Sequence, residues 1–139
     1  MSEESAAPTG KKTRVLVVED DRFLQKILLM KFESEGFVTV GASDGEEGLR
    51  LARTDKPDLI VLDLILPKVN GFEVPTELKT EAATKAIPVV VLSNLGQDED
   101  IRRVLELGAL DFLVKSNHSI MEVVSKVKEA YAKHLRGGK

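Results

Sequence analysis

The stretch PDLIVLDLILPKVNG, residues 57–71, decides the fold class. Leu59 to Leu62 form a continuous apolar run, which is typical of a strand covered on both faces rather than on one. The run ends in a carboxylate, Asp63, and apolar residues resume immediately after it. An ionisable group beside a core strand costs free energy unless something compensates it. The stretch therefore predicts a buried parallel strand with a charged residue placed at its carboxyl end.

The rest of the chain alternates short apolar runs with longer amphipathic stretches. Strands are predicted at 14–18, 37–41, 58–62, 88–92 and 111–115, and helices at 22–36, about 45–54, from near Gly71, about 98–107 and about 117–135. Ser43 and Glu46 have the spacing of a capping box for the second helix. Five strands alternating with five helices through right-handed crossovers predict an α/β three-layer sandwich around a parallel sheet.

Length and composition fit one globular domain. The chain has 139 residues, of which 42% are hydrophobic and 31% charged, with a net charge of −3. We expect a disordered tail over 1–12, a domain over 13–136 and a frayed end over 137–139, because the ends are rich in small and polar residues.

Several function classes are disfavoured by composition. Cysteine is absent, so thiol chemistry and disulfides are excluded. No basic cluster indicates nucleic-acid binding, and no apolar stretch is long enough to insert into a membrane. The amino terminus lacks the apolar region of a secretory signal. We therefore expect a cytoplasmic protein that binds no nucleic acid.

Polar residues follow four of the predicted strands at their carboxyl ends, where open parallel sheets bind ligands. They are Glu19, Asp20 and Asp21 after the first strand, Asp63 after the third, Ser93 and Asn94 after the fourth, and Lys115 at the end of the fifth. Each has a simpler interpretation: an N-cap for the acids after the first strand, a turn residue before Pro67 and Gly71 for Asp63, a loop hydroxyl for Ser93, and a solvated strand end for Lys115.

Taken together, the set has the chemistry of a divalent-cation site beside a phosphoryl site. Crowded carboxylates repel one another, and Mg²⁺ prefers one or two carboxylates together with waters and phosphate oxygens. Lys115 can neutralise a phosphoryl oxygen as a point charge, and Ser93 can donate a hydrogen bond to one. A carboxylate that faces the phosphorus is a candidate nucleophile.

At this point the sequence resembles the response-regulator receiver domain of two-component signal transduction, over about residues 13–135. The matching features are VEDD after the first strand, Asp63 in VLDLILPKVNG, Ser93 in VVVLSN, and GALDFLVK, which ends in Lys115. The resemblance implies the flavodoxin-like (βα)5 fold with strand order 2-1-3-4-5.

The resemblance also implies residue roles. Asp63 accepts a phosphoryl group from a sensor histidine kinase or a histidine phosphotransfer protein. Mg²⁺ is bound by Asp20, Asp63, the Ile65 carbonyl and, through water, Glu19. Lys115 and Ser93 contact the phosphoryl oxygens.

For switching, the resemblance implies that Ser93 and Phe112 alter the face made by helix 4, strand 5 and helix 5, to which an unknown downstream partner binds. An ordinary half-buried strand aromatic is the alternative for Phe112. The chain is then expected to be a stand-alone receiver rather than an enzyme. Its only chemistry is accepting the phosphoryl group and losing it.

Two residues depart from the family pattern: Ser116 stands where a proline usually follows the lysine, and Asn94 stands at a position that is usually small. Ile65 and Leu95 place apolar bulk beside the site, and our hypothesis is that they hinder the water that would hydrolyse the acyl phosphate.

Two other functions are retained as alternatives. The first is a receiver-like docking module that works without phosphorylation. The second is an enzyme or cofactor binder on the same fold. A haloacid-dehalogenase phosphatase needs an aspartate where Ile65 stands, and no glycine-rich phosphate loop follows the first strand.

Overall fold

The computed structural model describes residues 12–66 and 72–137. Its five strands are β2 (Arg14–Val18), β3 (Val38–Ala42), β4 (Leu59–Leu62), β5 (Val89–Ser93) and β6 (Asp111–Val114). All neighbouring strands pair in parallel. The sheet order is β3-β2-β4-β5-β6, which is 2-1-3-4-5 when the strands are counted along the chain. This confirms the predicted fold class and strand order.

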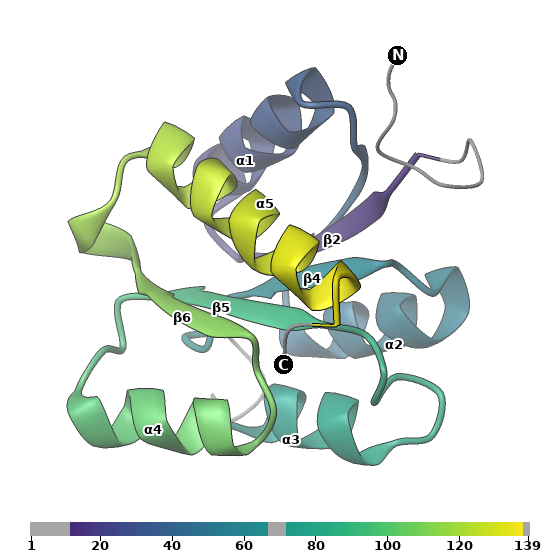
Figure 1. Cartoon of the computed structure of the whole chain (residues 1–139), viewed down its shortest axis with the longest axis vertical. Helices are drawn as coiled ribbons and strands as arrows, with labels where there is room; N and C mark the ends of the chain where they lie inside the picture. The colour runs from purple at the N-terminus through teal and green to yellow at the C-terminus, as the bar shows by residue number, and fades with distance from the viewer. Residues whose placement is uncertain (1–11, 67–71, 138–139) are drawn as a thin grey trace.

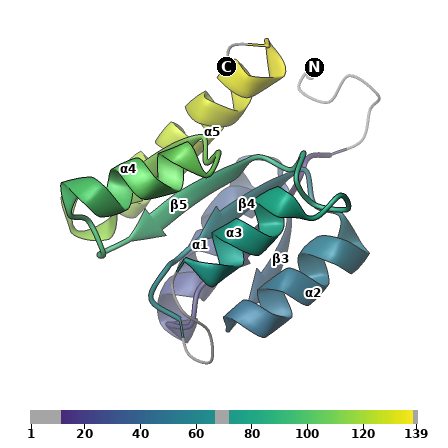
Figure 2. The ribbon, with the colours of Figure 1, turned by 90° about the horizontal axis from the view of Figure 1, so that it is seen from below.

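Helices cover both faces of the sheet (Figure 1). They are α1 (Arg22–Ser34), α2 (Gly45–Asp55), α3 (Glu73–Thr80), α4 (Asp98–Glu106) and α5 (Ile120–Leu135), with a short 3₁₀ turn, η1 (Lys115–Asn117), after β6. Figure 2 shows α2, α3 and α4 together on one face, while α1 and α5 lie behind the sheet on the other. The three layers follow from right-handed crossovers between parallel strands.

The core is divided by the sheet into two halves because successive side chains of a strand point to opposite faces. In β2, Leu16 and Val18 pack in the half covered by α2, α3 and α4. Val15 and Val17 pack in the half covered by α1 and α5. Both faces of the strand are therefore buried, which explains why its sequence is continuously apolar rather than alternating.

Helix starts correct two of the predictions. The N-cap of α2 is Asp44, whose Oδ1 accepts a hydrogen bond from the Glu47 amide at 2.8 Å, so the predicted Ser43–Glu46 capping box is wrong by one residue. The last helix begins at Ile120 rather than near residue 117, because residues 115–117 form the separate turn η1. A capping box between Ser119 and Glu122 fixes that start.

Some predictions fall partly outside the described residues. The predicted disordered tail over 1–12 lies outside them except for Lys12, and so do Pro67 and Gly71. The third helix begins at Glu73, with Pro75 in its first turn, where a missing N–H is tolerated. The peptide bonds of the described residues are trans, including the bond between Lys115 and Ser116.

Candidate functional site: an acidic pocket with a bridging lysine

The site lies at the carboxyl edge of the sheet, where β2 and β4 end side by side. The Glu19 amide donates to the Ala42 carbonyl at 2.9 Å, and the Asp63 amide donates to the Val18 carbonyl at 3.0 Å. These bonds continue the sheet hydrogen bonding by one residue beyond β2 and β4. The backbone of both acidic residues is therefore held by the sheet rather than by a free loop.

Three carboxylates meet at this edge. Glu19, Asp20 and Asp63 each offer an oxygen that lies within 4.8 Å of the others. Glu19 is only 1% exposed and Asp63 only 3%, whereas Asp20 is exposed. Two carboxylates about 4 Å apart repel each other by about 4 kcal/mol at an effective dielectric near 20. The cluster therefore requires a positive charge close by.

Lys115 supplies that charge from the other side of the pocket. Its Nζ lies 2.7 Å from Glu19 Oε1 and 2.8 Å from Asp63 Oδ2. Burial alone would lower the pKa of Lys115, but hydrogen bonds to Asp63 and Glu19 outweigh it and raise the pKa above its ordinary value. The solvated strand end considered for Lys115 is therefore wrong, as is its assignment to the strand, because β6 ends at Val114.

Each oxygen of the two buried carboxylates has a partner. The second oxygen of Glu19 accepts from the Asp21 amide at 3.0 Å, and Asp63 Oδ1 accepts from the Ile65 amide at 3.0 Å. Burial nevertheless raises the pKa of Glu19, more than the bonds from Lys115 and Asp21 lower it. Asp21 also caps α1 by accepting from the Leu24 amide, as the simpler interpretation of the acids predicted.

The donor set fits a hard divalent cation. All three side chains offer carboxylate oxygens, which Mg²⁺ prefers, and the exposed Asp20 leaves one side open to water. A cation here would also offset the desolvation that raises the pKa of Glu19. Glu19, Asp20 and Asp63 are thus the residues that could hold Mg²⁺.

The other predicted site residues occupy neighbouring positions. Ser93 is the last residue of β5 and is fully buried, and its Oγ accepts from the Leu95 amide at 3.2 Å. Phe112 is 8% exposed and packs in the same core half as Val104 of α4. The Ile65 side chain is 54% exposed beside Asp63.

The contacts of two residues near the site were not predicted from sequence: Gln25 was not singled out at all, and Asn94 was singled out without its partner. The Gln25 amide group on α1 donates to the Glu19 carbonyl at 2.9 Å and to the Ala42 carbonyl at 2.8 Å, which fixes the start of the acidic segment. Gly41 makes room for it, since a Cβ there would lie 2.6 Å from Gln25 Oε1. Asn94 Oδ1 accepts from the Ser116 amide at 2.9 Å, which joins the two departures from the family pattern. A helical glutamine and a loop asparagine carry no sequence signal for such contacts.

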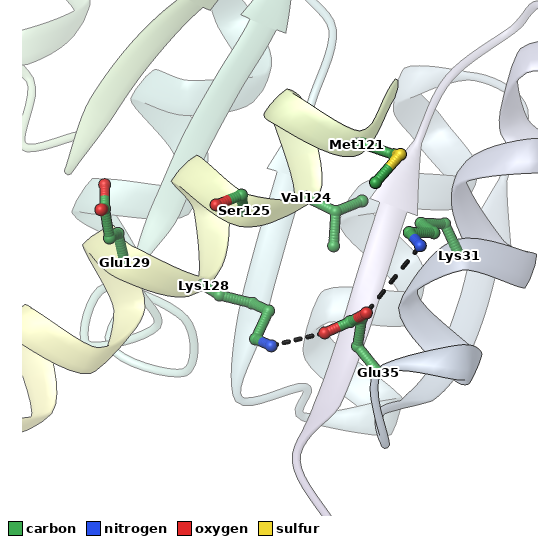
Figure 3. Close-up of a pocket in the computed structure, with 7 residues that line it drawn as sticks. All are labelled: Lys31, Glu35, Met121, Val124, Ser125, Lys128 and Glu129. Carbon is green, nitrogen blue, oxygen red and sulfur yellow. Dashed lines mark hydrogen bonds and ion pairs between the residues drawn. The ribbon is translucent and has the colours of Figure 1, made fainter. Parts of the chain in front are cut away.

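A separate hollow of about 400 Å³ lies between α1 and α5, away from the acids (Figure 3). It is lined by Lys31, Glu35, Met121, Val124, Ser125, Lys128 and Glu129. Glu35 bridges the two helices by accepting from Lys128 Nζ at 2.6 Å. The hollow contains none of the three clustered acids, so it is distinct from the site.

Comparison with known proteins agrees with the fold. The family model of the response regulator receiver domain matches residues 15–128. A solved structure of the receiver domain of the Francisella response regulator 1452 superposes with a TM-score of 0.78 at 32% identity, covering 88% of this chain and 99% of that one. The chain belongs to the response regulator receiver domain family, whose members act in two-component systems.

Curated relatives carry the same segment within longer proteins. The Bacillus subtilis alkaline phosphatase synthesis transcriptional regulatory protein PhoP is 41% identical over 117 residues, which are 83% of this chain and 47% of that protein. A Geobacter sulfurreducens protein-glutamate methylesterase/protein-glutamine glutaminase is 36% identical over 129 residues, 91% of this chain and 34% of that protein. The chain thus spans half or less of the length of these relatives. None of the helices described in residues 12–66 and 72–137 is long and apolar enough to cross a membrane.

Proposed function

We propose that this receiver accepts a phosphoryl group on Asp63 from a phosphohistidine of a sensor histidine kinase or a phosphotransfer protein. The observation that carries the proposal is the pairing of three clustered carboxylates with Lys115, whose Nζ lies 2.8 Å from Asp63 Oδ2. Asp63 is the one acid that combines burial with a direct contact to Lys115 and a position at the centre of the sheet edge after β4. Glu19 is also buried and bound to Lys115, but it follows β2 rather than the central strand β4.

The transfer needs no further reactant. A carboxylate oxygen of Asp63 attacks the phosphorus, an O–P bond forms, and the P–N bond breaks with its electron pair going to the imidazole nitrogen. Lys115 neutralises charge on the phosphoryl oxygens, for which its ammonium is already within reach of Asp63. Bound Mg²⁺ would screen the carboxylates from the incoming anion. Hydrolysis of the acyl phosphate then returns Asp63 to its starting form, so in this proposal the chemistry of the receiver takes place on its own Asp63.

The proposed switch connects this chemistry to a partner-binding face. The phosphoryl group adds a charge of about −1.5 to −2 at Asp63. Ser93, at the end of the adjacent β5, exchanges its bond with the Leu95 amide for one to the phosphoryl group. The loop before α4 moves with it, and Phe112 repacks under the face of α4, β6 and α5. The chain then has two packings of this face, before and after phosphorylation. A downstream partner that binds one packing more tightly responds to the shift in their populations.

The deciding experiment supplies a small phosphodonor with Mg²⁺. Acetyl phosphate plus Mg²⁺ should add one phosphoryl group to the wild type, as measured by intact mass, and peptide mapping should place it on Asp63. Asp63→Asn should remain unmodified, and chelation of Mg²⁺ should block the reaction. A wild type that gains no mass, and that shows no Mg²⁺-dependent spectral change with beryllofluoride, would instead support a docking module that works without phosphorylation.

A further inference from the structure

The loop after β5 is joined to the turn after β6 by one side chain. Asn94 Oδ1 accepts a hydrogen bond from the Ser116 amide at 2.9 Å, across 22 residues of sequence. Ser116 directly follows Lys115, whose ammonium holds both Glu19 and Asp63. Asn94 directly follows Ser93. The bond therefore joins two segments of the site. One is the turn that carries Lys115, the cation bound to Glu19 and Asp63, and the other is the loop that carries the Ser93 hydroxyl.

The Ser116 amide is available for this bond because of where it lies. Ser116 is the second residue of η1, and the first amides of a helical turn have no partner within it. Val114, which caps η1, provides no side-chain hydrogen bond. Asn94 supplies the missing acceptor from outside the turn and thereby fixes the backbone on the carboxyl side of Lys115.

The loop after β5 and the end of β6 are also in close van der Waals contact. A Cβ at Gly96 would lie 2.9 Å from Val114 Cγ2, so the loop after β5 passes directly over the residue that precedes Lys115. Val114 also pairs with Ser93 in the sheet register. Lys115 is thus held on one side by Val114, under Gly96 and beside Ser93, and on the other by Ser116, bonded to Asn94.

We propose that Asn94 is a positioning residue, which through the Ser116 amide holds the backbone of Lys115 so that its ammonium spans Glu19 and Asp63. The expected effect of Asn94 on ligand binding rests on the proposed function: when a phosphoryl group is added to Asp63, Lys115 is already positioned to contact its oxygens. The same bond ties the loop of Ser93 to the lysine, so that any movement of Ser93 toward the phosphoryl group is transmitted to the turn after β6.

The first test uses nuclear magnetic resonance of the metal-free protein, so that the Asn94–Ser116 bond and the placement of Lys115 are measured without any ligand. Asn94→Ala should speed hydrogen exchange at the Ser116 amide about three- to tenfold, the range set by one net hydrogen bond. It should also broaden the Lys115 ammonium resonance, which is sharp only while the ion pairs slow its proton exchange. Asn94→Asp keeps an acceptor oxygen and should retain the slow exchange at Ser116. Asn117→Ala, which removes an exposed amide group from the same turn, should change neither signal.

Binding of beryllofluoride with Mg²⁺ then gives the functional readout. Asn94→Ala should weaken it by about three- to tenfold relative to the wild type, as expected for the loss of one such bond. Unchanged exchange at Ser116, or faster exchange with an unaltered Lys115 ammonium signal, would overturn the positioning role. Failure of the wild type to bind beryllofluoride would count against the proposed function alone, because the exchange and ammonium measurements need no ligand.

Discussion

Lys115 Nζ lies 2.8 Å from Oδ2 of Asp63, although 52 residues separate the two in the chain. The same nitrogen lies 2.7 Å from Glu19. One ammonium therefore offsets two buried carboxylates, while the third acid of the cluster, Asp20, is exposed and is not in contact with it. This unequal division of charge determines how the site responds to metal and to substitution.

Mg²⁺ should stabilise the wild type, because a ligand that binds only the native state adds about 2.7 kcal/mol at a hundredfold excess over its Kd. Asp20→Asn should lose most of that gain, and it should raise the Tm in metal-free buffer because it removes one of the mutually repelling charges without breaking a contact of Lys115. Differential scanning calorimetry with and without millimolar Mg²⁺ measures both effects. Asp21→Asn is the matched control, since asparagine still caps α1. Equal Mg²⁺ shifts in the wild type and Asp20→Asn would count against a metal site here.

Lys115→Met should destabilise the metal-free protein by about 2–3 kcal/mol, somewhat less than the loss of one partner from a fully buried pair. The reason is that Glu19 and Asp63 remain buried without a cation. Adding Mg²⁺ should reduce the deficit, because the metal takes over the charge compensation. Urea titrations in both buffers give the two free energies of unfolding. The exposed Lys26 of α1 provides the comparison: Lys26→Met should change stability by much less, and equal losses for the two variants would refute the bridging role.

The ion pair of Glu35 with Lys128 should make a small, pH-dependent contribution to stability (Figure 3). The hydrogen bond and charge of Lys128 lower the pKa of Glu35 below its ordinary value. The contribution is therefore fully present above the ordinary pKa of a glutamate and is lost as the pH falls through the lower, folded pKa.

Glu35→Gln should cost about 0.5 kcal/mol at pH 7, since both side chains are partly exposed, and nothing at acidic pH where Glu35 is protonated in both states. Urea unfolding across this pH range, at low and high salt, measures the difference. Glu129→Gln changes a carboxylate that lines the same hollow and forms no ion pair with the described residues, so its effect should be near zero at every pH. A constant deficit for Glu35→Gln down to acidic pH would contradict the assignment.

Ile65→Asn should shorten the lifetime of the phosphorylated form several-fold, provided that Asp63 is the acceptor. Ile65 is 54% exposed and lies two residues after Asp63, and our hypothesis is that its bulk hinders an attacking water more than the smaller asparagine would. Mass spectrometry of the decay after removal of the phosphodonor gives the lifetime. Met30→Asn alters a similarly exposed apolar residue on α1 and should leave the decay unchanged. Identical decay in the wild type and Ile65→Asn would remove the shielding hypothesis.

The sequence predicted most of the fold because the decisive features are local. Continuous apolar runs such as 59–62 are typical of strands covered on both faces, and their alternation with helical segments favours a parallel sheet. Because β2 and β4 are parallel neighbours, their carboxyl ends bring Glu19 and Asp63 to one edge of the sheet. The prediction that they meet there therefore needed no side-chain contacts. This is why the acidic cluster could be predicted from strand ends alone.

Contacts that depend on precise backbone placement could not be predicted. Ser43 and Asp44 are both good N-cap residues, and each has a glutamate three positions later, so the pattern gives two equivalent starts for α2. The structure selects Asp44. The bond between Asn94 and Ser116 likewise depends on how two loops meet, which no periodicity encodes.

Strand direction also separates the pocket from the described ends of the chain. β2 begins, and α5 ends, at the edge of the sheet opposite the acids, where Tyr131 of α5 packs against the core half that contains Val15 of β2. A fluorescent reporter or an affinity handle attached at the start of β2 or at the end of α5 is thus on the side remote from Asp63. Labelled versions can be immobilised or imaged through that side while the carboxyl edge stays accessible to a phosphodonor.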